Sequence, residues 1–142
     1  DVGGEVGIKE MDTFVDKNSD KPMQLGQMAF AVYAAQQRKG KVHETILANA
    51  LKAAEKAAKE LPDHPMAQET HARLVHQSGN LDLAVEIMEK FIDSSERKSP
   101  RASNFLKQLQ EEKAKEEEAK EEEAKEEKPG DESDDDESTK EK

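Results

Sequence analysis

The sequence predicts an all-α protein built from stacked helical hairpins, with a long charged C-terminal helix and a disordered acidic tail. Three observations predict this fold. Apolar residues recur at helical intervals in four segments between residues 20 and 95. Pro or Gly stands next to most of the expected helix ends. Charged side chains make up 24 of the last 32 residues, so this stretch has too little apolar surface to form a core.

The acidic charge of the chain is concentrated in its last quarter. Residues 111–142 hold 17 of the 33 acidic and 7 of the 22 basic residues, which leaves a net charge of -1 for residues 1–110. This balance argues against nucleic acid or an anionic membrane surface as the main partner. No apolar run is long enough for membrane insertion. Cysteine is absent, which excludes disulfides, thiolate zinc sites and cysteine catalysis.

Residues 1–21 are expected to form a flexible N-terminal arm. They contain three of the seven glycines and a polar cluster at residues 16–21. The spacing of Ile8, Met11, Phe14 and Val15 suits only one or two helical turns. The segment GGEVG superficially resembles a phosphate-binding loop, but it lacks the preceding strand, the glycine spacing and the Lys-Ser or Lys-Thr that follow in such loops. The chain begins at Asp1, which is compatible with a processed product or a fragment of a longer protein.

A helical domain is expected over residues 22–110. Asp20 is the expected cap of a helix that opens at Pro22 and stops at Gly40. A second helix covers residues 45–61 and ends before Pro62. The third follows a cap at residue 63 or 64, opens at Pro65 and runs to Gly79. The fourth, residues 81–95, is capped by Asn80 and carries an apolar stripe of Leu81, Ala84, Val85, Met88 and Phe91 or Ile92.

A further helix is expected to begin at Ser99 and Pro100 and to cap the last hairpin with Phe105, Leu106 and Leu109. It leads into residues 111–128, a Glu/Lys-rich single helix or spacer. Pairs four residues apart support this helix by about 0.3 to 0.5 kcal/mol each. They are Glu111 with Lys115, Glu116 with Lys120, and Glu121 with Lys125. Residues 129–142 are expected to be disordered.

Small residues recur at particular places in the hairpins. Counted from Pro65, Ala72, Gly79 and Ala84 occupy positions 8, 15 and 20. One unit earlier, Ala50, Ala57 and Pro62 fall on the second-helix small positions and the closing proline. This pattern resembles the tetratricopeptide repeat, a 34-residue helix-turn-helix unit.

The repeat pattern is incomplete. Gln68, His71, Phe91 and Glu96 depart from it, and the turn of the earlier unit carries a five-residue insertion. One good and one degenerate repeat are therefore expected, with a generic helical hairpin as the alternative.

The stretch from Asn49 to Asp93 also resembles the C-terminal helical region of certain secreted bacterial thioredoxin-like proteins. The shared features are ALKAAEKA, a Thr-x-Ala-Arg-Leu segment that begins at Thr70, and GNLDLAVEIMEK. No Cys-x-x-Cys is present, so thiol-disulfide activity is not transferred to any residue here. The resemblance implies an extracytoplasmic origin, periplasmic or secreted, and a missing N-terminal partner domain.

No catalytic, cofactor-binding or metal-binding residue is predicted. The histidines His43, His64, His71 and His76 have no recognisable nucleophile beside them. His71, His76 and Glu69 are considered as metal ligands. The two histidines are five residues apart, whereas helical zinc motifs space them by four, so the imidazoles lie on different sides of a helix. The acidic run 134–136 lacks the ordered turn of a calcium loop.

Two function classes remain open. The first is a non-catalytic protein–protein interaction module, in which stacked hairpins present a concave face to a protein or peptide partner. The second is a structural region of a larger thioredoxin-like thiol-disulfide protein, whose catalytic domain is not in this chain. Met23, Met28 and Tyr33 are candidates for either kind of contact, although core packing is the more usual role of such residues.

Overall fold

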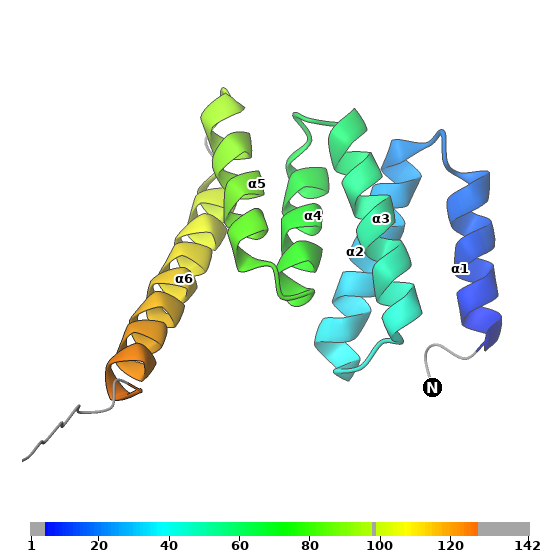
Figure 1. Cartoon of the computed structure of the whole chain (residues 1–142). Coiled ribbons are helices and arrows are strands. Elements are labelled where there is room, and N and C mark those ends of the chain that lie inside the picture. Colours follow the sequence, from blue (N-terminus) through cyan, green and yellow to red (C-terminus); the bar gives the residue numbers. More distant parts are fainter. Residues whose placement is uncertain (1–4, 98, 128–142) are drawn as a thin grey trace, which may run out of the picture.

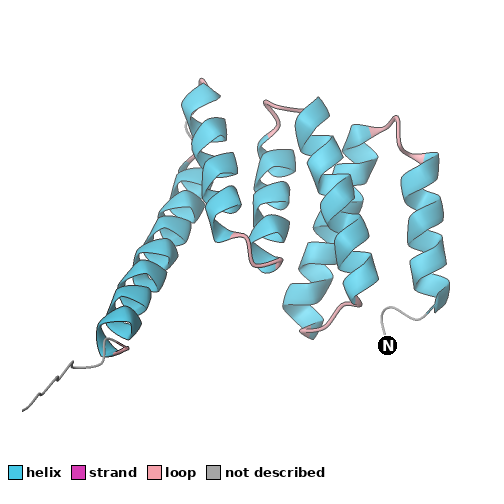
Figure 2. Ribbon diagram, in the orientation of Figure 1, coloured by secondary structure: helices cyan, strands magenta, loops and turns pink. Residues whose placement is uncertain are grey.

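The computed structural model describes residues 5–97 and 99–127, and in this part of the chain it contains six helices and no strand (Figures 1 and 2). The prediction of an all-α protein is confirmed. The helices are α1 (Glu5–Lys17), α2 (Pro22–Lys39), α3 (Glu44–Glu60), α4 (Pro65–Gln77), α5 (Leu81–Ser94) and α6 (Pro100–Glu126). The acidic segment 129–142 lies outside the described residues.

The helices follow one another as an alternating row from α1 at one edge to α6 at the other (Figure 1). Each of α2 to α5 packs against the next helix of the chain, and α1 packs against α3. Because direction alternates, α2, α4 and α6 run the same way, and α2 also contacts α4 directly. This arrangement brings three parallel helices to one side of the molecule.

Most helix ends are where the sequence places them. Pro22, Pro65 and Pro100 each occupy the first residue of a helix, and Gly40 ends α2 in a left-handed conformation with φ of 75°. His64 caps α4 through Nδ1, which accepts from the amide of Ala67 at 3.3 Å. The remaining side-chain caps are His43 on α3, Asn80 on α5 and Ser99 on α6. The predicted Asp20 cap is wrong, because Lys21 precedes α2 and supplies no side-chain hydrogen bond.

The N-terminal segment is more ordered than the predicted arm. Helix α1 spans 13 residues instead of one or two turns. Met11 is buried against α2, α3 and α4 residues, and Asp12 accepts a hydrogen bond from Asn49 of α3. The tertiary contact with α3 stabilises a helix whose own sequence pattern is short, because packing of one apolar face contributes more than intrinsic propensity.

Small residues dominate the packing between the helices. The predicted repeat-signature alanines Ala50, Ala57, Ala72 and Ala84 are all fully buried. Ala72 and Ala84, on α4 and α5, belong to one cluster, and Gly79 between them has φ of 94°, a conformation that favours glycine. Pro62 is exposed just after the end of α3. In the first hairpin Gly26 faces Ala57, whose Cβ is 3.5 Å from where a Cβ on residue 26 would lie. Helices α2 and α3 therefore approach closely.

Helix α6 has an anchored part, residues 100–113, and a projecting part, residues 114–126. In the anchored part Phe105 and Leu109 are buried and Leu106 is half-buried, as expected. Contacts reach beyond the predicted boundary at residue 110, because Lys113 Nζ lies 3.0 Å from Asp82 Oδ1 of α5. Every residue of the projecting part is exposed.

The three predicted Glu–Lys pairs do not form contacts within 4.0 Å in the described structure of α6. Long exposed side chains lose entropy when they are fixed, and water competes for both charges. The pairs therefore act as an average attraction along the helix rather than as fixed bonds.

Candidate functional site

A groove runs across the three parallel helices α2, α4 and α6. It encloses a hollow of about 260 Å³. Its lining comes from all three helices: Tyr33 and Gln37, then Arg73, His76 and Gln77, then Phe105, Gln108, Leu109 and Glu112. We call this surface the α2–α4–α6 groove.

Arg73 of α4 forms the centre of this groove. Its guanidinium carbon lies 4.0 Å from the centroid of the Phe105 ring and 5.7 Å from that of Tyr33. Nη1 donates to the Tyr33 hydroxyl at 3.2 Å. A guanidinium over aromatic rings is held by cation–π attraction, and more strongly where water is partly removed. Arg73 thus links the three helices through one side chain.

Glu69 lies one turn before Arg73 and balances its charge. A single carboxylate oxygen, Oε1, accepts from Arg73 Nε at 3.0 Å, from Arg73 Nη2 at 2.8 Å and from Arg101 Nε at 3.0 Å. Glu69 is buried, whereas the Arg101 side chain is mostly exposed. Burial of a carboxylate is costly unless it is paired, so the two arginines compensate for its lost hydration.

A second polar contact closes the other end of the groove. His76 Nε2 lies 2.9 and 3.0 Å from the two carboxylate oxygens of Glu112. This contact joins the last turn of α4 to α6, and the Lys113–Asp82 pair next to it joins α6 to α5. The hydrogen bond to Asp82 raises the pKa of Lys113. Both ends of the groove are therefore fixed by polar contacts.

Exposed apolar side chains continue the groove towards the N-terminal ends of its helices. The Phe30 ring lies 6.4 Å from that of Tyr33 and is 37% exposed. On α2, Met23 precedes Phe30 by seven residues, and on α4, Met66 precedes Arg73 by seven. Seven residues are about two helical turns, so each methionine lies on the same face of its helix as the later residue. Both methionines are exposed. The face thus combines a fixed polar centre with accessible apolar groups.

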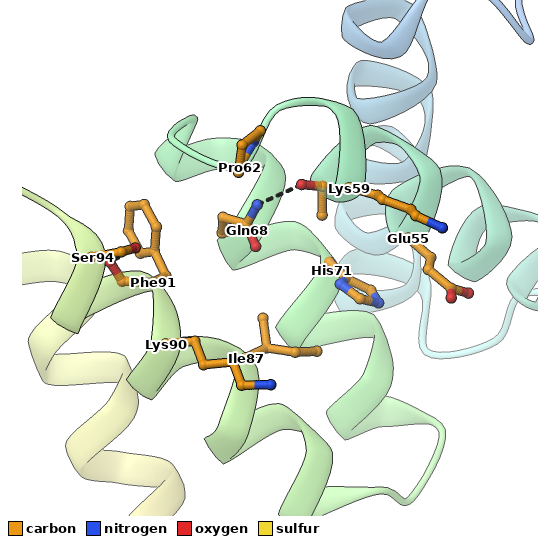
Figure 3. Close-up of a pocket in the computed structure, with 10 residues that line it drawn as sticks. Glu55, Lys59, Pro62, Gln68, His71, Ile87, Lys90, Phe91 and Ser94 are labelled. Atoms are coloured by element: carbon orange, nitrogen blue, oxygen red, sulfur yellow. Dashed lines mark hydrogen bonds between the residues drawn. The ribbon is translucent and has the colours of Figure 1, made fainter.

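A larger hollow of about 450 Å³ lies between α3, α4 and α5 (Figure 3). Gln68 of α4 donates to the carbonyls of Ala58 and Leu61 at 2.8 and 3.2 Å, which satisfies the C-terminal end of α3. His71 points into this hollow, with Glu55 on α3 beside it (Figure 3). Burial lowers the pKa of His71, and the nearby Glu55 carboxylate raises it by less. His71 is thus half-buried between the helices, with Ile87 and the charged Glu55, Lys59 and Lys90 lining the same hollow.

The residues considered as metal ligands are separated by the fold. His71 faces the hollow between α3 and α5, whereas His76 and Glu69 face the α2–α4–α6 groove and are paired with Glu112 and with two arginines. Within residues 5–97 and 99–127, no three His, Cys, Asp or Glu side chains gather as metal ligands do. Glu69 and His76 therefore each have protein partners.

Sequence reasoning missed the residues that form the groove. The sequence predicts Phe105 only as a packing residue and Tyr33 only as a candidate contact, and it gives Arg73 and Arg101 no role of their own. One local signal was available, since Glu69 and Arg73 are four residues apart on one helix.

No family model, curated protein or solved structure matches the chain. In the part of the chain that the structure describes, no helix has the length and apolar character needed to cross a membrane.

Proposed function

We propose that this chain is a non-catalytic protein–protein interaction module, similar to tetratricopeptide-repeat scaffolds, whose α2–α4–α6 groove binds a protein or peptide segment. The observation that carries the proposal is the exposed apolar side chain of Phe30 beside the fixed Tyr33–Arg73–Phe105 centre. Apolar groups that remain accessible next to a rigid polar centre are typical of surfaces that bind partners.

The ionisable groups of the groove also favour binding over catalysis. Arg73 is held by Glu69, and His76 is held by Glu112. A general acid or base needs a proton to exchange with substrate, and a nucleophile needs an adjacent base. Side chains already engaged with one another serve instead to hold three helix faces at fixed spacing. A preorganised surface loses less entropy when a partner binds.

The test is selection of binders from a random peptide library displayed on phage, with the full chain as bait. Phe30→Asp and Leu83→Asp form a matched pair, because the two side chains are 37% and 38% exposed and Leu83 lies on α5, outside the groove. Selected peptides should lose binding to Phe30→Asp and keep it with Leu83→Asp. Met66→Asp provides a second groove variant, and circular dichroism checks that each variant is folded.

Selected peptides that bind equally to all three variants would show that the groove is not the binding surface. That outcome would favour the alternative function, a bracing region in a larger thioredoxin-like protein.

A further inference from the structure

We infer that the segment bound in the α2–α4–α6 groove is basic, with an apolar anchor beside Phe30 and Lys or Arg side chains towards the projecting part of α6. This inference rests on the proposed function and specifies its partner. It is carried by the charge that follows the groove along α6.

The groove face of α6 continues as an acidic ledge. Counted from Phe105, residues 112, 116 and 123 are 7, 11 and 18 positions further on, and in an α-helix these spacings return to the same face. All three are glutamates with exposed side chains. Lys113 is turned towards α5, where it pairs with Asp82. We call Glu112, Glu116 and Glu123 the acidic ledge.

The groove itself carries no charge that would oppose a basic segment. Arg73 and Arg101 share the Glu69 carboxylate, and the Glu112 carboxylate contacts His76, so the arginines near the groove are already paired with a carboxylate. In contrast, residues 111–127 contain ten glutamates and four lysines. A segment leaving the groove along α6 therefore passes from a surface of paired charges to a strongly acidic one.

The helix ends reinforce this gradient. Helices α2 and α4 run in the same direction as α6, so their carbonyl ends lie towards the ledge. Carbonyl ends carry partial negative charge. At the end of α2 this partial charge is offset by Arg38, whose Nε donates to the Ala34 carbonyl oxygen at 3.4 Å. The glutamates of the ledge therefore carry the gradient: they repel an acidic segment, whereas a basic one gains from complementary charge.

The experiment uses the full chain and two synthetic amphipathic peptides that share one leucine pattern, one with lysine and one with glutamate at every polar position. Fluorescence anisotropy measures the dissociation constant of each. The lysine peptide should bind at least about ten-fold more tightly than the glutamate peptide. The difference should shrink as salt is raised from about 50 mM to about 300 mM, because exposed charges are screened.

Two double variants with the same change in net charge locate the contact. Glu116→Lys with Glu123→Lys reverses the ledge, whereas Glu118→Lys with Glu121→Lys changes the opposite face of α6. The ledge variant should weaken binding of the lysine peptide about ten-fold or more, and the opposite-face variant far less. Phe30→Asp should also weaken it, whereas Leu83→Asp should not.

Equal weakening by both double variants would reveal unspecific charge attraction and overturn the inference. Equal affinity for the two peptides, lost in Phe30→Asp, would also overturn it while leaving the groove as a binding surface. If neither peptide bound, the inference of a basic partner would be overturned. The proposed function would then be tested by the library selection alone.

Discussion

The hairpin body and the projecting part of α6 are both helical, yet they are stabilised in different ways. In the body, α2 to α5 and residues 100–113 of α6 bury alanines, Met88, Phe105 and Leu109 between neighbouring helices. In the projecting part, residues 114–126 bury nothing. Body helices therefore depend on one another, whereas the projecting part depends on its own sequence.

This difference separates two uses of a helix in one chain. The position of a packed helix depends on the shape of its contact face. Extra side-chain volume at that face disturbs the packing of the neighbouring helices. The projecting part is specified by helix propensity and average charge, and many substitutions there are equivalent. The body can therefore hold a binding surface of fixed geometry. The projecting part can contribute charge and length, but no fixed surface.

The largest expected effect tests the first half of this comparison. Ala84→Glu introduces volume and an unpaired charge at a fully buried contact in the α4–α5 hairpin. Such a change costs about 3 kcal/mol or more, a large share of the stability of a small domain. The thermal unfolding transition, followed by circular dichroism, should fall by many degrees.

A matched change on the exposed face of the same helix is the control for Ala84→Glu. Glu86→Gln removes only a surface pair, in which Glu86 Oε1 is 2.7 Å from Lys90 Nζ. Its effect should not exceed about 0.5 kcal/mol. If Ala84→Glu melted like the parent protein, Ala84 would be on the surface and the packing of the second hairpin would be wrong.

A smaller effect is expected from pH, again in the body alone. Burial lowers the pKa of His71 in the folded state below its usual 6.5, so the unfolded chain takes up a proton first as pH falls. Stability from the neutral imidazole is thus fully present above pH 6.5 and is lost as pH falls from there to the folded-state pKa. The groups that face His71 are Glu55 and Lys59 of α3 and Lys90 of α5.

Urea unfolding at a series of pH values from about 7.5 to about 5 measures this loss. His71→Gln should flatten the pH dependence relative to the parent. Identical pH profiles for the parent and His71→Gln would show that His71 is not protonated more readily on unfolding.

The smallest effect tests the other half of the comparison. Truncation after Lys113 removes the projecting part and keeps the His76–Glu112 and Lys113–Asp82 contacts. The midpoint of thermal unfolding should change by less than about 2 °C, because exposed helical residues do not couple to the core. The helical signal should fall in proportion to the residues removed. A drop of many degrees would show that residues 114–126 support the body.

Local features of the fold were predictable from the sequence because their causes are local. A cap bonds its own helix within three residues, so Asn80 and Ser99 are recognised without knowledge of the rest of the structure. Asp20 was wrong because the chain reaches α2 through Lys21, and the choice between neighbouring cap residues depends on the preceding turn. Helix α1 was underestimated because its stability comes from α3.

The groove was not predictable, because its contacts join distant parts of the sequence. Arg73 meets Tyr33 across 40 residues, and Arg101 meets Glu69 across 32. No spacing rule relates such positions, since the helix order in space decides which side chains meet. The alanines and Gly79 predict how the helices of a hairpin pack, but they carry no information about the charged residues of the groove.

The pairing of each helix with its sequence neighbours also has a consequence for how the chain folds. Because the main contacts join consecutive helices, the loops that must close are short. Proteins with mostly local contacts fold quickly, in microseconds to milliseconds. The α2–α3 hairpin can form as soon as its residues have left the ribosome, and each later helix then adds to an existing surface. Helix α6 follows the other five described helices in the chain, so the groove is completed only after the hairpins can form.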